Sequence, residues 1–162
     1  MDLILWRHAE AEAAEHEGDD LERDLTRKGQ RQARRVARWL DQHLGDGVRI
    51  WSSPAVRAER TVVALGRPYK VRDELSPLAV AGDVLALIGW NEAQGLPQRH
   101  PLLIVGHQPW LGEVASCLLG CGAGTGMVIR KGAAWWLRSL ADDERAYATL
   151  YAVLHPDLAA SH

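Results

Sequence analysis

The sequence predicts an α/β fold, a three-layer sandwich in which helices cover both faces of a mostly parallel central sheet. Short apolar runs alternate with amphipathic segments along most of the chain, which is typical of strands joined by crossover helices. The runs at residues 3–6 and 102–105 are apolar at every position, as expected of strands buried on both faces. With 162 residues, the chain is expected to form one domain over residues 1–162.

The first elements follow from apolar spacing and from a capping residue. A strand is expected at residues 3–6, and a loop at residues 10–24, where eight carboxylates occur without apolar periodicity. Thr26 can cap a helix over residues 27–44, because its hydroxyl can accept from a free backbone N–H of the first turn. A second strand is expected at residues 48–51.

Ser53 is expected to cap the next helix, which has Pro54 at its first position and stops near Gly66. Further elements are expected, in chain order, as a strand at residues 69–71, a helix at 83–91, a strand at 102–105, a helix at 109–119 and strands at 127–130, 134–137 and 147–154.

The composition argues against several classes of function. Nineteen basic and 21 acidic side chains give a net charge of −2, whereas a general nucleic-acid binder needs a basic surface. The apolar run near the N-terminus is short and is interrupted by Arg7, so we expect a cytoplasmic protein without membrane contact. No His or Cys pair completes a tetrahedral set with Cys117 and Cys121, so neither a metal nor a cofactor is expected.

Arginines and histidines stand where predicted strands end. Arg7 and His8 follow the first strand, Arg57 lies shortly after the second, and His107 follows the strand at residues 102–105. Carboxyl ends of parallel strands meet at one edge of a sheet, where such folds bind ligands. Two guanidinium groups suit a tetrahedral oxyanion, and one neutral imidazole can attack phosphorus while the other supports charge.

Five segments, in order along most of the chain, carry a resemblance to a known family. They are Leu-Trp-Arg-His at residues 5–8, Arg-Asp-Leu-Thr-Arg-Lys-Gly at 23–29, Ser-Ser-Pro-Ala-Val-Arg-Ala-Glu-Arg-Thr at 52–61, Glu-Leu-Ser-Pro at 74–77 and Val-Gly-His-Gln-Pro at 105–109. Together they resemble the histidine phosphatase superfamily, the phosphoglycerate-mutase-like group. Within it, the chain is most similar to the small bacterial phosphohistidine phosphatases of the SixA type.

The resemblance implies a role for each matching residue. His8 matches the phosphorylated nucleophile, Arg7 and Arg57 the catalytic phosphate-binding arginines, and His107 the second catalytic histidine, which also binds phosphate. Arg23 lies in a matching segment and is given a peripheral place in the phosphate site. The implied activity is hydrolysis of phosphohistidine through a covalent phosphohistidine on His8. The implied partner is a phosphorelay or phosphotransfer carrier, such as a histidine phosphotransfer domain, and the enzyme is expected to be a monomer.

Two departures from the family pattern bear on the substrate. The family glycine after the histidine is Ala9, which could shift the loop. No clear acid for an alcohol leaving group is present, and Glu74 and Asp83 are weak candidates. Phosphohistidine needs such an acid less, because its ring can be protonated on the far nitrogen and leave neutral. The short chain leaves little for a lid, so we expect an open site.

Two other functions remain open from the sequence. The same nucleophile could serve a small-molecule phosphomonoesterase. Because Ala9 replaces the family glycine, the chain could also be a non-catalytic module that binds phosphohistidine without cleaving it.

Overall fold

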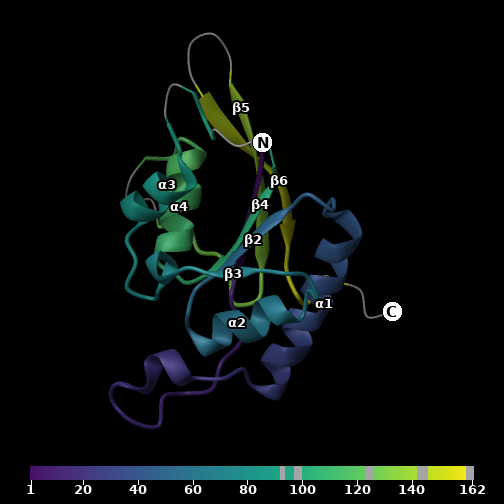
Figure 1. Ribbon diagram of the computed structural model, residues 1–162, viewed down its shortest axis with the longest axis vertical. Coiled ribbons are helices and arrows are strands. Elements are labelled where there is room, and N and C mark those ends of the chain that lie inside the picture. The colour runs from purple at the N-terminus through teal and green to yellow at the C-terminus, as the bar shows by residue number, and fades with distance from the viewer. Residues whose placement is uncertain (92–93, 97–99, 123–125, 142–145, 160–162) are drawn as a thin grey trace.

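A six-stranded sheet in the order β3-β2-β4-β1-β5-β6 forms the middle of the molecule (Figure 1). The computed structural model describes residues 1–91, 94–96, 100–122, 126–141 and 146–159. Strands β3, β2, β4 and β1 are parallel, whereas β5 pairs antiparallel with both β1 and β6. The strands are β1 Asp2–Arg7, β2 Arg49–Ser52, β3 Lys70–Val71, β4 Leu102–Gly106, β5 Ala134–Ala141 and β6 Ala146–Leu154.

Helices cover both faces of the sheet, as the sequence predicts (Figure 1). Helices α1 and α2 lie over one face and α3 and α4 over the other. No helix in the described part of the chain combines the length and the apolar character needed to cross a membrane. The helices are α1 Arg27–His43, α2 Val56–Val63, α3 Ala81–Ile88 and α4 Trp110–Leu118, with 3₁₀ turns η1 at Asp19–Glu22 and η2 at Asp73–Leu75.

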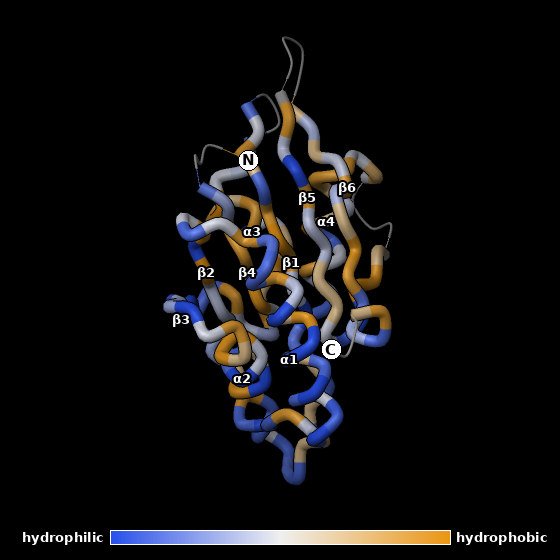
Figure 2. Tube along the Cα trace, turned by 90° about the vertical axis from the view of Figure 1, so that its right-hand side faces the viewer, coloured by the Kyte–Doolittle hydropathy of each residue, from blue (hydrophilic) through white to orange (hydrophobic). Residues whose placement is uncertain are grey.

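Strand β1 contributes to the hydrophobic cores on both sides of the sheet. Successive side chains of a strand point to opposite faces. Leu3 and Leu5 therefore pack with α3 and α4, while Ile4 and Trp6 pack with α1 and α2, and all four are fully buried. Figure 2 shows the resulting apolar centre along β1 and β4. Burying such side chains stabilises the fold by about 1.5–3 kcal/mol each, which fixes β1 beneath the residues that follow it.

Helix α1 begins where its capping residue predicts. The hydroxyl of Thr26 accepts a hydrogen bond of 2.9 Å from the backbone N–H of Gly29. Gly29 also lies so close to the carbonyl of Glu10 that a Cβ there would collide with it. The glycine thereby lets the start of α1 pack directly on the backbone that follows His8.

Two local predictions are wrong. Helix α2 begins at Val56, after the turn at Pro54, so Ser53 is not its cap. The hydroxyl of Ser53 instead accepts from the backbone N–H of Ala55 and contacts His107. Residues 127–130 do not form a strand: the carbonyls of Met127 and Ile129 accept from side chains, and that of Arg130 accepts from the backbone N–H of Ala133 in a turn.

Candidate functional site

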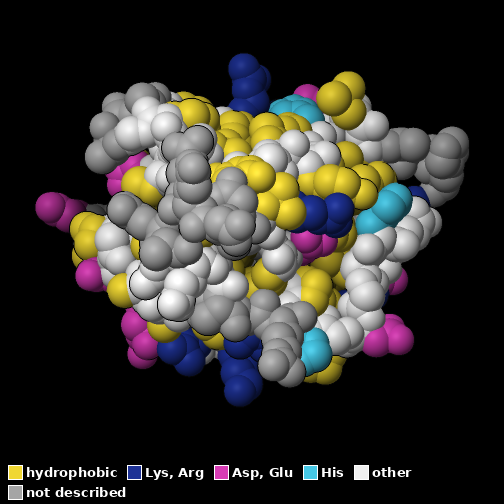
Figure 3. Space-filling model, turned by 90° about the horizontal axis from the view of Figure 1, so that it is seen from above, with side chains coloured by type: hydrophobic (Ala, Val, Ile, Leu, Met, Phe, Trp, Pro, Cys, Tyr) yellow, Lys and Arg dark blue, Asp and Glu magenta, His cyan; other side chains and the backbone are white. Residues whose placement is uncertain are grey.

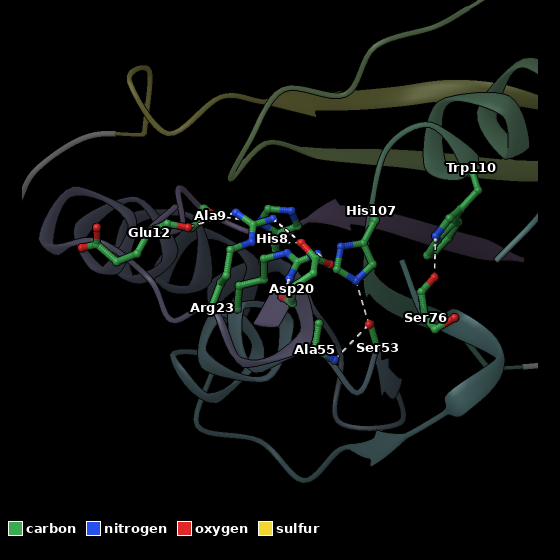
Figure 4. Close-up of polar contacts among 11 residues, drawn as sticks. His8, Ala9, Glu12, Asp20, Arg23, Ser53, Ala55, Ser76, His107 and Trp110 are labelled. Carbon is green, nitrogen blue, oxygen red and sulfur yellow. Dashed lines mark hydrogen bonds and ion pairs between the residues drawn. The ribbon is translucent and has the colours of Figure 1, made fainter. Parts of the chain in front are cut away.

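The ladder of the parallel strands brings the predicted site residues together. Arg7 is in register with Gly106, and the backbone N–H of His8 donates to the Gly106 carbonyl at 3.1 Å. The backbone N–H of Ser53 donates to the carbonyl of Val105 at 3.0 Å. The ends of β1, β2 and β4 therefore place His8, Ser53 and His107 side by side (Figure 4).

The two histidines face each other inside the protein. Their ring centroids are 5.1 Å apart, and His8 and His107 are 5% and 2% exposed. The Nδ1 atom of His8 lies 2.7 Å from the carbonyl oxygen of Ala9. A carbonyl can only accept a hydrogen bond, so Nδ1 carries the proton and Nε2 of the neutral ring keeps a free lone pair.

Both imidazoles are held neutral. Burial, together with the charges of Arg57 and Arg7, lowers the pKa of His8 to about 3. Burial, followed by the neighbouring His8 and Arg57, lowers the pKa of His107 to about 2. At neutral pH the lone pair of His8 is therefore available for nucleophilic attack.

Ser53 fixes the orientation of the second histidine. Its Oγ lies 2.7 Å from Nε2 of His107 and also accepts from the N–H of Ala55 at 3.2 Å. The other ring nitrogen of His107, Nδ1, is buried and has no hydrogen-bond partner among the described residues. If the Ser53 hydroxyl donates to Nε2, the free Nδ1 carries the proton and can serve as a donor.

The two arginines also have unused donors. Arg7 donates through one Nη to the carbonyl of Ile129 at 2.9 Å, which holds the side chain at the end of β1. The Nε atoms of Arg7 and Arg57 are both buried and have no partner among the described residues. Unpaired buried donors are costly, and together with Nδ1 of His107 in its protonated tautomer these groups suit an oxyanion.

Arg57 and Arg23 share one carboxylate. An Nη of Arg57 lies 2.9 Å from Oδ2 of Asp20, and its other Nη donates to the Asp20 backbone carbonyl. Arg23 bonds Oδ1 of the same carboxylate through Nε at 3.0 Å and Nη at 2.9 Å. Asp20 lies in η1, so these bonds attach the acidic segment, residues 10–24, to helix α2 (Figure 4).

Thr61 joins α2 to the loop that follows His8. Its hydroxyl donates to the carbonyl of Arg57 at 2.7 Å and accepts from the backbone N–H of Ala9 at 3.0 Å. Ala9 is fully buried, and positive φ angles among the described residues occur only at glycines. The alanine thus fits the position without backbone strain, and its small side chain packs beside Leu25 and Ala33.

The structure places the remaining predicted residues in different surroundings. Arg23 and Arg57 bond the two oxygens of the same carboxylate, that of Asp20. Glu74 pairs with Arg72 at 3.1 Å, and Asp83 is an exposed residue in the first turn of α3. No contact found in the described structure joins either carboxylate to the histidines.

Sequence reasoning missed three contributors to the site and misjudged its exposure. Asp20, Ser53 and Thr61 contact site residues directly, and all three lie in or just before segments that match the family pattern. The expectation of an open site is wrong, because the two histidines and Arg57 are buried and η1 lies against α2. In the described part of the chain, no group of three or more His, Cys, Asp or Glu is arranged to hold a metal ion.

This arrangement has the parts needed for transfer of an anionic group. Nε2 of His8 is a nucleophile with a free lone pair, and the guanidinium groups of the buried Arg57 and the partly buried Arg7 add permanent positive charge to its surroundings. Fixed cations stabilise the charge that develops on a phosphoryl group during in-line transfer.

Comparisons with known proteins agree with a site for phosphoryl transfer. Residues 3–80 match the model of the histidine phosphatase superfamily (branch 1). An uncharacterized protein of Picosynechococcus is 32% identical over 146 residues, 86% of this chain and 86% of that protein. A structure of the protein histidine phosphatase SixA complexed with tungstate has a TM-score of 0.74 at 24% identity, over 97% of this chain and 98% of that one.

A mycobacterial glucosyl-3-phosphoglycerate phosphatase in complex with VO3 has a TM-score of 0.68 at 18% identity, over 93% of this chain and 96% of that one. At these identities the two structures establish the fold. The expected phosphoglycerate-mutase-like architecture is confirmed.

Proposed function

This chain belongs to the histidine phosphatase superfamily and is a phosphatase, and we propose that its substrate is a phosphohistidine displayed on a carrier protein. In this proposal the carrier is a cytoplasmic phosphorelay or phosphotransfer protein. The observation that carries the proposal is the free Nε2 of His8, set beside two arginines whose buried Nε donors have no partner among the described residues.

The proposed reaction has two steps that balance with one water molecule. Nε2 of His8 attacks phosphorus, and the bond from phosphorus to the substrate nitrogen breaks as that ring leaves. Water then attacks the phosphoryl group on His8, the new Nε2–P bond breaks, and inorganic phosphate departs with the imidazole of His8 restored. Arg7 and Arg57 hold the phosphoryl oxygens in both steps, and Nδ1 of His107 supplies a further donor.

The chemistry of the leaving group supports a P–N substrate. An alkoxide is too basic to leave without a proton donor, whereas an imidazole protonated on its far nitrogen leaves as a neutral ring. Glu74 is paired with Arg72 and Asp83 is exposed, so neither is joined to the site. A substrate that brings its own proton fits this set of residues better than a phosphate ester.

Substrate comparison tests the proposal. We expect a phosphorylated histidine phosphotransfer domain to be hydrolysed with a kcat/KM at least about 100-fold above that of sugar phosphates, since leaving-group protonation is typically worth 10²–10⁴ in rate. His8→Asn is the matched inactive control, because its amide can still donate to the carbonyl of Ala9. Faster turnover of the sugar phosphates would identify a small-molecule phosphomonoesterase instead. Binding of the phosphorylated carrier without hydrolysis would identify a recognition module.

A further inference from the structure

Among the described residues, Asp20 is the one carboxylate bonded to Arg57, one of the predicted phosphate-binding arginines. We propose that Asp20 is the residue that makes this site discriminate against phosphomonoester dianions in favour of phosphoimidazolium groups. The inference rests on the proposed function, and it assigns the substrate preference to one side chain that acts through Arg57 and Arg23.

Asp20 contacts the two arginines through different oxygens, and it is far more exposed than Arg57. Oδ2 bonds Arg57 at 2.9 Å, Oδ1 bonds Arg23 at 2.9–3.0 Å, and the backbone carbonyl takes a further N–H of Arg57. The Arg57 side chain is 3% exposed, whereas that of Asp20 is 53% exposed. The carboxylate therefore approaches the buried guanidinium from the solvent side, from which a substrate must also enter.

Asp20 leaves one part of Arg57 free for a ligand. It uses donors on both Nη atoms, while Nε remains buried without a partner. A phosphoryl oxygen can therefore bind Arg57 while Asp20 stays in place, and two anions then share one guanidinium. Although burial acts to raise it, hydrogen bonds from Arg57 and Arg23 hold the pKa of Asp20 below its ordinary value, so the carboxylate is ionised at neutral pH.

The shared arginine makes the net charge of the substrate decisive. A phosphomonoester carries close to two negative charges at neutral pH, because its second pKa is near 6. A phosphohistidine protonated on its far ring nitrogen carries one positive charge beside the same phosphoryl group. An adjacent carboxylate repels the first substrate more strongly than the second. Asp20 thus lowers affinity for esters and for inorganic phosphate while sparing the phosphoimidazolium.

The test compares Asp20→Asn with Glu22→Gln. Both changes remove one negative charge from η1, but Glu22 forms no ion pair or hydrogen bond with Arg57 or Arg23 within the described structure. For each variant, kcat/KM is measured on a phosphorylated histidine carrier and on p-nitrophenyl phosphate, and the inhibition constant of inorganic phosphate is measured as well. A purely structural loosening of η1 would lower both rates together and leave their ratio unchanged.

In Asp20→Asn we expect the ratio of carrier to ester kcat/KM to fall roughly five-fold or more and the inhibition constant of phosphate to fall by a similar factor, as loss of one nearby charge predicts. Glu22→Gln should change both quantities less than about two-fold, because its charge is screened by solvent. An unchanged or increased ratio in Asp20→Asn would overturn the inference.

The proposed function can fail separately, if the wild-type protein does not hydrolyse the phosphorylated carrier. The inhibition constant of phosphate then decides the role of Asp20. A fall in Asp20→Asn but not in Glu22→Gln supports the charge effect, and no fall refutes it.

Discussion

Arg138 and Arg57 are each held by an aspartate, but the two pairs use the guanidinium differently. Arg138 donates through Nε at 2.8 Å and Nη at 3.0 Å to the two oxygens of Asp2, a bidentate pair that uses the Nε donor. Arg57 gives only Nη donors to Asp20 and keeps a buried Nε without a partner in the described structure. The first pair is closed and structural, whereas the second retains donor capacity for a ligand.

The two pairs lie at opposite ends of β1. Asp2 begins the strand and His8 follows its last residue, a separation of roughly 20 Å at 3.3 Å per residue. Figure 3 shows the molecule from the end at which β1 begins, where hydrophobic side chains gather beside Lys or Arg and Asp or Glu side chains. A comparable pair of residue types thus fastens β1 to β5 at one end and prepares an anion site at the other.

Burial is also reversed between the two pairs. The Arg138 side chain is 41% exposed over an Asp2 that is 17% exposed, whereas Arg57 is 3% exposed beneath an Asp20 that is 53% exposed. The bond to Asp2 raises the pKa of Arg138, while burial lowers that of Arg57. A buried and incompletely paired cation costs stability and is typical of functional sites.

The largest expected effect comes from replacing Arg57 by lysine, with Arg138→Lys as the matched comparison. Arg57→Lys should lower phosphatase kcat/KM by roughly 10²–10³, because an ammonium group cannot reproduce directed donors at the transferring group. Arg138→Lys should leave kcat/KM within about two-fold, since exposed ion pairs contribute only about 0–1 kcal/mol. Steady-state kinetics on any one substrate measures both variants, and comparable losses would show that the distinction between the pairs is wrong.

A smaller effect, on the pH dependence of the free energy of unfolding, distinguishes the two ends of β1. His8 and His107 stay neutral in the folded protein down to a pH of about 3 and about 2, whereas the unfolded chain protonates them near 6.5. The unfolded state therefore gains protons first as the pH falls below 6.5. The free energy of unfolding should drop by about 1.4 kcal/mol per pH unit for each histidine. The Asp2 carboxylate, whose pKa is lowered through Arg138, stays ionised in this window.

Urea unfolding at pH 7.5, 6.5 and 5.5 measures this dependence. His8→Asn should remove about one histidine's share of the slope between pH 6.5 and 5.5, and Asp2→Asn should leave the slope unchanged. A slope that His8→Asn does not alter would mean that His8 titrates normally in the folded protein.

Much of the fold could be predicted because burial on two faces leaves a plain sequence signal. The continuous apolar runs of β1 and β4 and the Thr26 cap of α1 were confirmed. Residues 127–130 were misassigned because an apolar run without its partner strand cannot be distinguished from a loop whose carbonyls bind side chains, as that of Ile129 binds Arg7. Ser53 matches the chemistry of a helix cap, but its hydroxyl is taken by Ala55 and His107.

The site could be predicted in part, because its main residues lie at or after the ends of predicted parallel strands. Arg7 ends β1, His8 and His107 directly follow β1 and β4, and Arg57 lies in the helix after β2. Parallel register brings these strand ends together. Asp20 lies in a segment without periodicity, where eight carboxylates in residues 10–24 are indistinguishable by sequence pattern. Only the folded backbone selects which of them contacts Arg57. Ala9 stands where the family has glycine, yet its backbone has a φ that any residue adopts.

The most direct test of the central claim is identification of the phosphorylated histidine during turnover. The protein is mixed with a ³²P-labelled phosphohistidine carrier and quenched rapidly at high pH, and the labelled peptide is mapped. The free Nε2 of His8 predicts an acid-labile, base-stable label on His8 that is absent from His8→Asn. A label on His107, or full turnover by His8→Asn, would contradict the account.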